Sequence, residues 1–168
     1  MKTLYLVRHA KSSWDDLALK DNERPLLPKG VNRTLRIGQF LISKKIVPDL
    51  VVSSHAVRAF ETAKILAGKM GYPLHEILIE GQLYFSGKEA MNDVVFGLPN
   101  DKSNVILIGH NPDMTNFANE FLSPKIDYLP TSGVVSLSFE TEKWEDIYRV
   151  PNYINFIISP KSMKNKDS

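Results

Sequence analysis

The sequence predicts a three-layer α/β/α sandwich with a mostly parallel central sheet. Three observations lead to this prediction. Short, continuously apolar segments typical of buried strands alternate with segments of helical periodicity. Turn-forming residues separate these segments. The 168 residues are enough for one domain with a substantial core. The last two strand-like segments follow each other without a long helix, so we expect one antiparallel edge.

The expected elements follow in order along the chain. Strands are expected at residues 3–7, 50–52, 74–79, 105–108, 134–139 and 147–150. Helices are expected at residues 30–44, 54–70, 88–96 and 113–122. Together they form one domain over residues 1–158. Residues 159–168 are polar, and we expect a tail without regular structure.

The second helix has the clearest pattern. Ser53 and Ser54 offer hydroxyl groups that could cap its first turn, and Gly71 is expected to end it. Its apolar residues recur at helical spacing: Ala56, Ala59, Phe60, Ala63, Leu66, Ala67 and Met70. Arg58 lies in the first turn but outside this apolar stripe, so it is available for a site.

Composition excludes several function classes. The net charge is +2, which gives no general case for nucleic acid or an anionic membrane as partner. No cysteine is present, which rules out disulfides, thiolate zinc sites and a cysteine nucleophile. No stretch approaches the roughly 20 apolar residues of a membrane span, and the apolar run at the start lacks the features of a signal peptide. We expect a cytoplasmic protein that can act as a monomer, without cofactor.

The candidate site combines residues that follow three different strands. Ligands of α/β sheets gather at the carboxyl ends of strands. Arg8 and His9 follow the first expected strand, Arg58 follows the second, and His110 follows the fourth. Four cationic or imidazole groups at one edge would repel each other unless an anion lay between them. Phosphate fits best, because guanidinium groups bind its oxygens through paired, charge-assisted hydrogen bonds.

His9 brings reactivity to this site. Neutral imidazole attacks phosphorus and forms a phosphoramidate that water can hydrolyse. Neighbouring cations should lower the pKa of His9 and keep it neutral. Arg8, Arg58 and protonated His110 would then stabilise the charge of the transition state. Ser12 and Asp15 are candidate phosphate-loop contacts, with a local turn as the equal alternative.

Three segments resemble the motifs of the histidine phosphatase superfamily, the phosphoglycerate-mutase-like family. These are residues 6–14 (LVRHAKSSW), 53–63 (SSHAVRAFETA) and 108–112 (IGHNP), and they occur in the family's order. The short chain and residues 21–26 (DNERPL) are similar to SixA-type phosphohistidine phosphatases. The resemblance implies a phosphoglycerate-mutase-like fold, His9 as nucleophile, and a phosphate pocket of Arg8, Arg58 and His110.

The sequence departs from the family at the general acid. Many relatives have a carboxylic acid after the third strand, where this chain has Glu80 followed by Gln82. Glu80 is therefore the candidate acid, with Asp15 and Asp113 as alternatives. Without an acid, substrates with an easy leaving group would be favoured, because general acid catalysis is typically worth about 10²–10⁴ in rate.

Several readings remain open. The favoured substrate is a phosphohistidine on a protein, as the resemblance implies. The alternatives are a phosphatase for small sugar or aryl phosphates and a non-catalytic phosphate-binding module. A metal site is disfavoured, since the spacing of the histidines matches no helical ligand pair. Arg24 is expected to form an ion pair with Asp21, and Trp14 to pack or to line the pocket.

Overall fold

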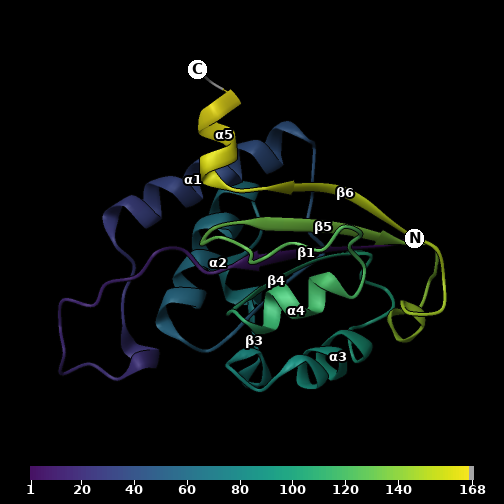
Figure 1. The fold of residues 1–168 in the computed structure, drawn as a ribbon, viewed down its shortest axis with the longest axis horizontal. Coiled ribbons are helices and arrows are strands. Elements are labelled where there is room, and N and C mark those ends of the chain that lie inside the picture. Colours follow the sequence, from purple (N-terminus) through teal and green to yellow (C-terminus); the bar gives the residue numbers. More distant parts are fainter. Residues whose placement is uncertain (167–168) are drawn as a thin grey trace.

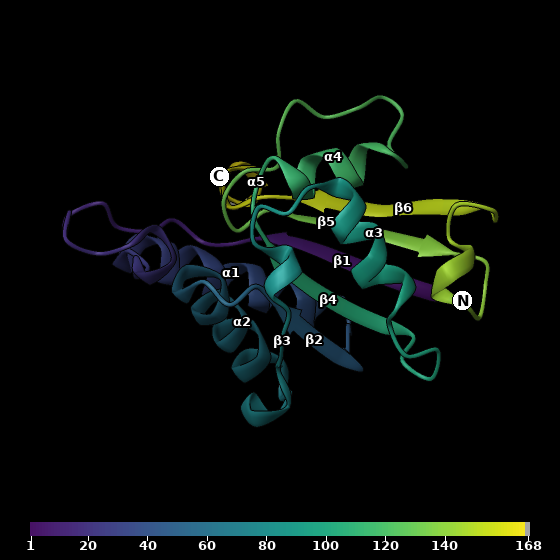
Figure 2. The same cartoon turned by 90° about the horizontal axis from the view of Figure 1, so that it is seen from below.

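The computed structural model describes residues 1–166 and contains one six-stranded sheet between two layers of helices (Figures 1 and 2). The strands are β1 (Lys2–Arg8), β2 (Leu50–Ser53), β3 (Leu78–Ile79), β4 (Asn104–Gly109), β5 (Val134–Phe139) and β6 (Asn152–Ile158). The helices are α1 (Pro28–Ser43), α2 (Val57–Met70), α3 (Lys88–Phe96), α4 (Asp113–Asn119) and α5 (Pro160–Lys166). The described part is thus the predicted three-layer α/β/α sandwich.

The strand order is β3-β2-β4-β1-β5-β6. The neighbours from β3 to β1 are parallel, whereas β5 is antiparallel to β1 and β6 is antiparallel to β5. The prediction of a mostly parallel sheet with one antiparallel edge is therefore confirmed. The carboxyl ends of β1, β4 and β2 lie side by side, which fixes the position of the candidate site.

Each face of the sheet has its own apolar core. One core joins the strands to α1 and α2 through residues such as Ile37, Leu41 and Leu66. The other joins them to α3 and α4 through residues such as Met91 and Phe117. Strand residues alternate between the two cores, so β1 and β4 are buried on both faces. This double burial explains their continuous apolar sequence.

The predicted third and last strands need correction. The third strand is only Leu78–Ile79, because the residues after Pro73 form a 3-10 turn, Leu74–Glu76. The last strand is not at residues 147–150 but at Asn152–Ile158. Ile147 is buried in the core after another 3-10 turn, Trp144–Asp146. The real edge strand has the sequence NYINFII; it is largely exposed, and Asn155 interrupts its apolar residues, unlike those of the inner strands.

Two predictions about the helices also need correction. The prediction of an unstructured tail is wrong over Pro160–Lys166, which forms α5 and packs beside α1 (Figure 1). Residues 167 and 168 lie outside the described residues. Helix α2 begins at Val57 without a side-chain cap, and the Ser54 hydroxyl instead accepts the Ala56 N–H at 3.2 Å. Gly71 ends α2 in a left-handed conformation, φ 73°, as predicted.

Candidate active site

The sheet brings the two candidate histidines together. Arg8 at the end of β1 is in register with Gly109 at the end of β4, so His9 and His110 follow adjacent strand ends. Their ring centroids are 5.1 Å apart. Arg58 enters from the first turn of α2, and its Nε lies 3.4 Å from Nε2 of His9. Groups separated by about 100 residues thus form one buried cluster, as the sequence predicted.

The hydrogen bonds of His9 define which nitrogen can react. Nδ1 lies 2.7 Å from the carbonyl oxygen of Ala10, an acceptor, so Nδ1 carries the proton. Nε2 is then left with its lone pair, toward which Arg58 points. Burial lowers the pKa of His9 to about 4; the Ala10 hydrogen bond opposes this shift, and the nearby arginines add to it. At neutral pH His9 is an uncharged imidazole whose Nε2 lone pair faces Arg58.

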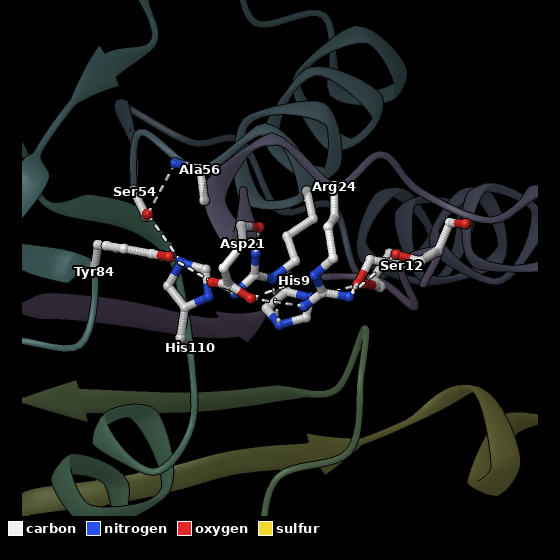
Figure 3. A network of polar contacts seen from close by, with 11 residues as sticks. His9, Ser12, Asp21, Arg24, Ser54, Ala56, Tyr84 and His110 are labelled. Atoms are coloured by element: carbon white, nitrogen blue, oxygen red, sulfur yellow. Dashed lines mark hydrogen bonds and ion pairs between the residues drawn. The ribbon is translucent and has the colours of Figure 1, made fainter. Parts of the chain in front are cut away.

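His110 is oriented by Ser54. Nε2 of His110 lies 2.9 Å from Oγ of Ser54, which already accepts the N–H of Ala56 (Figure 3). We assign the hydroxyl proton to this contact with Nε2, which places the imidazole proton on Nδ1. Nδ1 is buried and has no hydrogen-bond partner among the described residues. It is a donor held in place for an acceptor that the protein does not supply.

The structure indicates a different charge for His110 from the one predicted from the sequence. Burial, followed by the charges of His9 and Arg58, lowers the pKa of His110 to about 3. His110 is thus neutral in the free pocket, not protonated as predicted from the sequence. The reason is its depth, since only 1% of the residue is exposed. It can still donate a hydrogen bond through Nδ1, and a bound dianion would favour its protonation.

Arg8 supplies a second buried donor without a partner. Its Nε is buried and unpaired among the described residues, while one terminal nitrogen donates to the Leu129 carbonyl at 3.2 Å. Burial also lowers the pKa of Arg8. Buried polar groups are rarely left unpaired in proteins, because each costs about 1–3 kcal/mol. Two such donors around one nucleophile indicate an anion-binding pocket.

Asp21 is the functional residue that sequence reasoning missed. It was expected only as the ion-pair partner of Arg24, and that pair is confirmed at 3.2 Å. Its second carboxylate oxygen also accepts Arg58 at 3.0 Å and the hydroxyl of Tyr84 (Figure 3). Partial burial raises the pKa of Asp21, but the hydrogen bonds of Tyr84 and Arg58 outweigh that effect and lower it to about 2. The Asp21 carboxylate therefore accepts a hydrogen bond from Arg58 that a bound phosphoryl group could otherwise accept.

The loop after β1 supports this arrangement. Ser12 pairs with Leu26 in an antiparallel bridge, and the Ser12 hydroxyl accepts Arg24 at 2.9 Å. Ser12 lines the pocket, whereas Asp15 is exposed and does not. Trp14 lines the pocket, which was one of the two roles predicted for it. The guanidinium carbon of Arg24 lies 3.5 Å from the centroid of the Trp14 ring.

The pocket is an open cavity of about 400 Å³. Four cations and one carboxylate contribute to its lining: Arg8, Lys11, Arg24, Arg58 and Asp21. The exposed ring of Phe85 forms an apolar rim and lies 4.8 Å, between centroids, from the ring of His110. No sequence signal indicated Phe85, because it lies in an irregular loop and contacts the site only through the fold.

The candidate general acids lie outside the pocket lining. The carboxylate of Glu80 accepts the N–H of Gln82 at 3.1 Å and caps its own turn. Asp113 is buried and accepts the N–H of Gly87 at 3.1 Å. The assignment of Glu80 as acid stays a prediction. The one carboxyl group that lines the cavity, Asp21, is ionised and cannot donate a proton in this state.

Other site types find no support in residues 1–166. No group of three or more histidine or carboxylate side chains in this part of the chain is arranged to hold a metal ion. His55 is exposed and packs on Tyr84, with ring centroids 4.9 Å apart, and His75 is exposed. None of the helices described combines the length and apolarity that crossing a membrane requires.

The fold and the pocket define an α/β protein in which two buried histidines lie beside an arginine-lined cavity. A sequence model of the histidine phosphatase superfamily (branch 1) matches residues 4–81. An uncharacterized chloroplastic protein of Arabidopsis thaliana is 31% identical over 160 residues, which cover 88% of this chain and 71% of that protein. The chain belongs to the histidine phosphatase superfamily.

Further similarities concern parts of the chain or the fold. Phosphoglycerate mutase 1 of Saccharomyces cerevisiae is 37% identical over 71 residues, 41% of this chain and 29% of that protein. The structure of the protein histidine phosphatase SixA with tungstate matches with a TM-score of 0.81 at 20% identity, covering 96% of this chain and 99% of that one. A proposed SixA from Nakamurella multipartitia matches at 0.79, with 24% identity and 95% and 96% coverage. These structures share the phosphoglycerate-mutase-like fold of this chain.

Proposed function

We propose that this protein is a phosphatase that hydrolyses phosphohistidine through a phosphorylated His9. The observation that carries the proposal is the pocket itself. A neutral imidazole presents the lone pair of Nε2, and two buried donors, on Arg8 and His110, have no partner beside it. Membership of the histidine phosphatase superfamily and the similarity of the fold to SixA support the same reaction.

The reaction proceeds in two displacements. Nε2 of His9 attacks phosphorus, the bond from phosphorus to the substrate nitrogen breaks, and the leaving imidazole takes that electron pair. Arg8, Arg58 and the Nδ1 donor of His110 hold the equatorial oxygens as charge develops on them. Arg58 must release Nε2 of His9 and at least in part Asp21, because all three of its nitrogens are engaged in the free pocket. Water then attacks phospho-His9 and releases inorganic phosphate.

The leaving group argues for phosphohistidine. Among the described residues that line the pocket, the carboxyl group is that of Asp21, which is ionised and cannot protonate a poor leaving group such as a sugar alkoxide. An imidazole that is protonated on its other nitrogen leaves as a neutral ring. The exposed rings of Trp14 and Phe85 beside the cavity provide apolar surface on which such a ring can stack.

Trapping the intermediate tests the nucleophile. Brief incubation with ³²P-labelled phosphohistidine should label the protein with an acid-labile, alkali-stable adduct. His9→Ala should abolish the label, and His75→Ala, which changes an exposed histidine outside the pocket, should retain it. Label that persists in His9→Ala would refute the assignment.

A substrate panel separates the proposal from its alternative. The aromatic rim also accommodates an aryl phosphate, so a small-molecule phosphatase is the second candidate. We expect kcat/KM to be highest for phosphohistidine, lower for aryl phosphates and lowest for sugar phosphates. A sugar phosphate as the best substrate would overturn the preference. A reducing compartment such as the cytoplasm is the proposed location, because the sequence contains no cysteine.

A further inference from the structure

A second cavity, of about 460 Å³, lies beside the catalytic pocket. Thr131 lines both cavities, so the two share a wall. The residues of the described range 1–166 that line the second cavity include three cations, Arg33, Arg36 and Lys161, and no carboxylate. Its walls come from α1, from α5 and from the segment before β5.

Several contacts fix this cavity relative to His9. An added Cβ on Gly30 would lie 2.4 Å from the carbonyl oxygen of Lys11, so α1 packs directly on the loop after β1. The hydroxyl of Thr34 lies 2.9 Å from that of Ser132. The N–H of Ser132 in turn donates to the carbonyl of His9 at 3.2 Å. The second cavity is therefore held at a constant position next to the nucleophile.

The cations continue from one cavity to the other. Lys11 lines the catalytic pocket, and Lys29, Arg33 and Arg36 occupy positions i, i+4 and i+7 of one face of α1. We call these residues, with Lys161, the basic strip. None of the five forms an ion pair with another described residue. The positive charge of Lys11 lowers the pKa of Lys29, because two ammonium groups repel each other.

This concentration of charge is not explained by composition. The whole chain has a net charge of only +2, so the five cations of the strip leave the rest of the molecule net negative. Four of the five, all but Arg33, are exposed. The α1 part alone spans about 10 Å, at a rise of about 1.5 Å per residue. An exposed strip of this length suits several separate carboxylates better than it suits one phosphate.

We propose that the basic strip binds acidic side chains that flank the phosphohistidine of a polypeptide substrate. This inference rests on the proposed function and adds a substrate class to it. The phosphoryl group enters the catalytic pocket, and carboxylates of the same polypeptide lie along α1 toward Lys161. Exposed charges of this kind act mainly on the rate of association and on its dependence on salt.

Two phosphohistidine peptides of equal length test the proposal. One has aspartate and glutamate around the phosphohistidine, and the other has asparagine and glutamine at the same positions. We expect the acidic peptide to have the higher kcat/KM for the wild-type protein. Arg33→Glu/Arg36→Glu should lower kcat/KM for the acidic peptide by roughly tenfold or more, since each exposed ion pair contributes up to about fivefold. The advantage of the acidic peptide should also shrink at 0.5 M salt.

Matched controls make the result specific. Lys64→Glu/Lys143→Glu introduces the same change in charge at exposed positions that line neither cavity, and it should leave the preference for the acidic peptide intact. Turnover of para-nitrophenyl phosphate should stay at the wild-type level in both double variants, which shows that they fold.

The outcomes separate the two proposals. Equal kcat/KM for the two peptides, or an equal loss in both double variants, would overturn the role of the strip while the phosphohistidine phosphatase remains. Hydrolysis of para-nitrophenyl phosphate without hydrolysis of either peptide would overturn the proposed function, and the strip's substrate with it.

Discussion

Burial of a neutral histidine should make the stability of this protein depend on pH in a defined window. The pKa of His9 is about 4 in the folded protein, against 6.5 for the unperturbed group. Above pH 6.5 both states are neutral, and His9 adds no pH dependence. Between 6.5 and 4 the unfolded chain binds a proton that the folded protein does not, so stability falls as pH falls. Below pH 4 the folded protein also binds it, and the loss levels off.

The size of this effect follows from the shift. One pKa unit corresponds to about 1.4 kcal/mol, so His9 alone should remove about 2 kcal/mol between pH 7 and pH 5 and roughly 3 kcal/mol in full. Carboxylates and His110 also contribute, so the wild-type protein alone cannot isolate His9. His9→Asn can, because its side-chain amide retains a donor for the carbonyl of Ala10 and has no proton to gain.

Urea denaturation at a series of pH values provides the measurement. The free energy of unfolding of the wild-type protein should fall about 2 kcal/mol more than that of His9→Asn between pH 7 and pH 5. His75→Asn, the same substitution at an exposed position, serves as the control and should follow the wild-type protein. Parallel curves for the wild-type protein and His9→Asn would refute the buried neutral imidazole.

Further predictions concern catalysis and packing. Ser54→Ala should lower kcat by up to about 10²-fold, since the proton of His110 is no longer held on Nδ1; ¹⁵N spectra should show mixed tautomers, and an unchanged tautomer would contradict this role. Asp21→Asn should make inorganic phosphate a roughly tenfold stronger inhibitor, because the charged competitor for the arginines is lost; weaker inhibition would instead mean that the carboxylate positions them. Gly30→Ala should destabilise the fold by about 1–3 kcal/mol through its backbone clash. Gly68→Ala, in α2 with nothing within 4 Å of the added Cβ, should stabilise it by up to about 1 kcal/mol in thermal unfolding.

The main residues of the candidate site could be predicted from the sequence because each follows an inner strand. Arg8, His9 and His110 come directly after β1 and β4, whose continuous apolar runs are easy to recognise. Because β1, β4 and β2 are parallel neighbours, their carboxyl ends lie at the same edge of the sheet, and the residues that follow them lie close together. Arg58 follows the same logic, since it lies in the first turn of the helix after β2.

Asp21 and Phe85 were not accessible in this way, because Asp21 begins a short 3-10 turn, Asp21–Glu23, and Phe85 lies in an irregular loop, both away from the strand ends. The position of Asp21 depends on the bridge between Ser12 and Leu26 and on Arg58, which is 37 residues further along the chain. Local sequence patterns do not predict contacts between residues so far apart in the chain. The misplaced β6 has a similar cause, because its mostly exposed residues are placed by their antiparallel pairing with β5.

The position of Asp21 connects the stability of the free pocket with the affinity for phosphate. Without a counterion, Arg58 would be buried beside Arg8 and Arg24 with no negative charge, a costly arrangement. Asp21 supplies that charge, yet its side chain is 43% exposed and is held by hydrogen bonds that a phosphate dianion can replace. A fully buried carboxylate would bind Arg58 too strongly for phosphate to replace it. An apolar residue in the same place would leave the guanidinium group of Arg58 without a partner. A partly exposed carboxylate keeps the arginine in position and still yields to the substrate, and the same competition should favour release of the phosphate product.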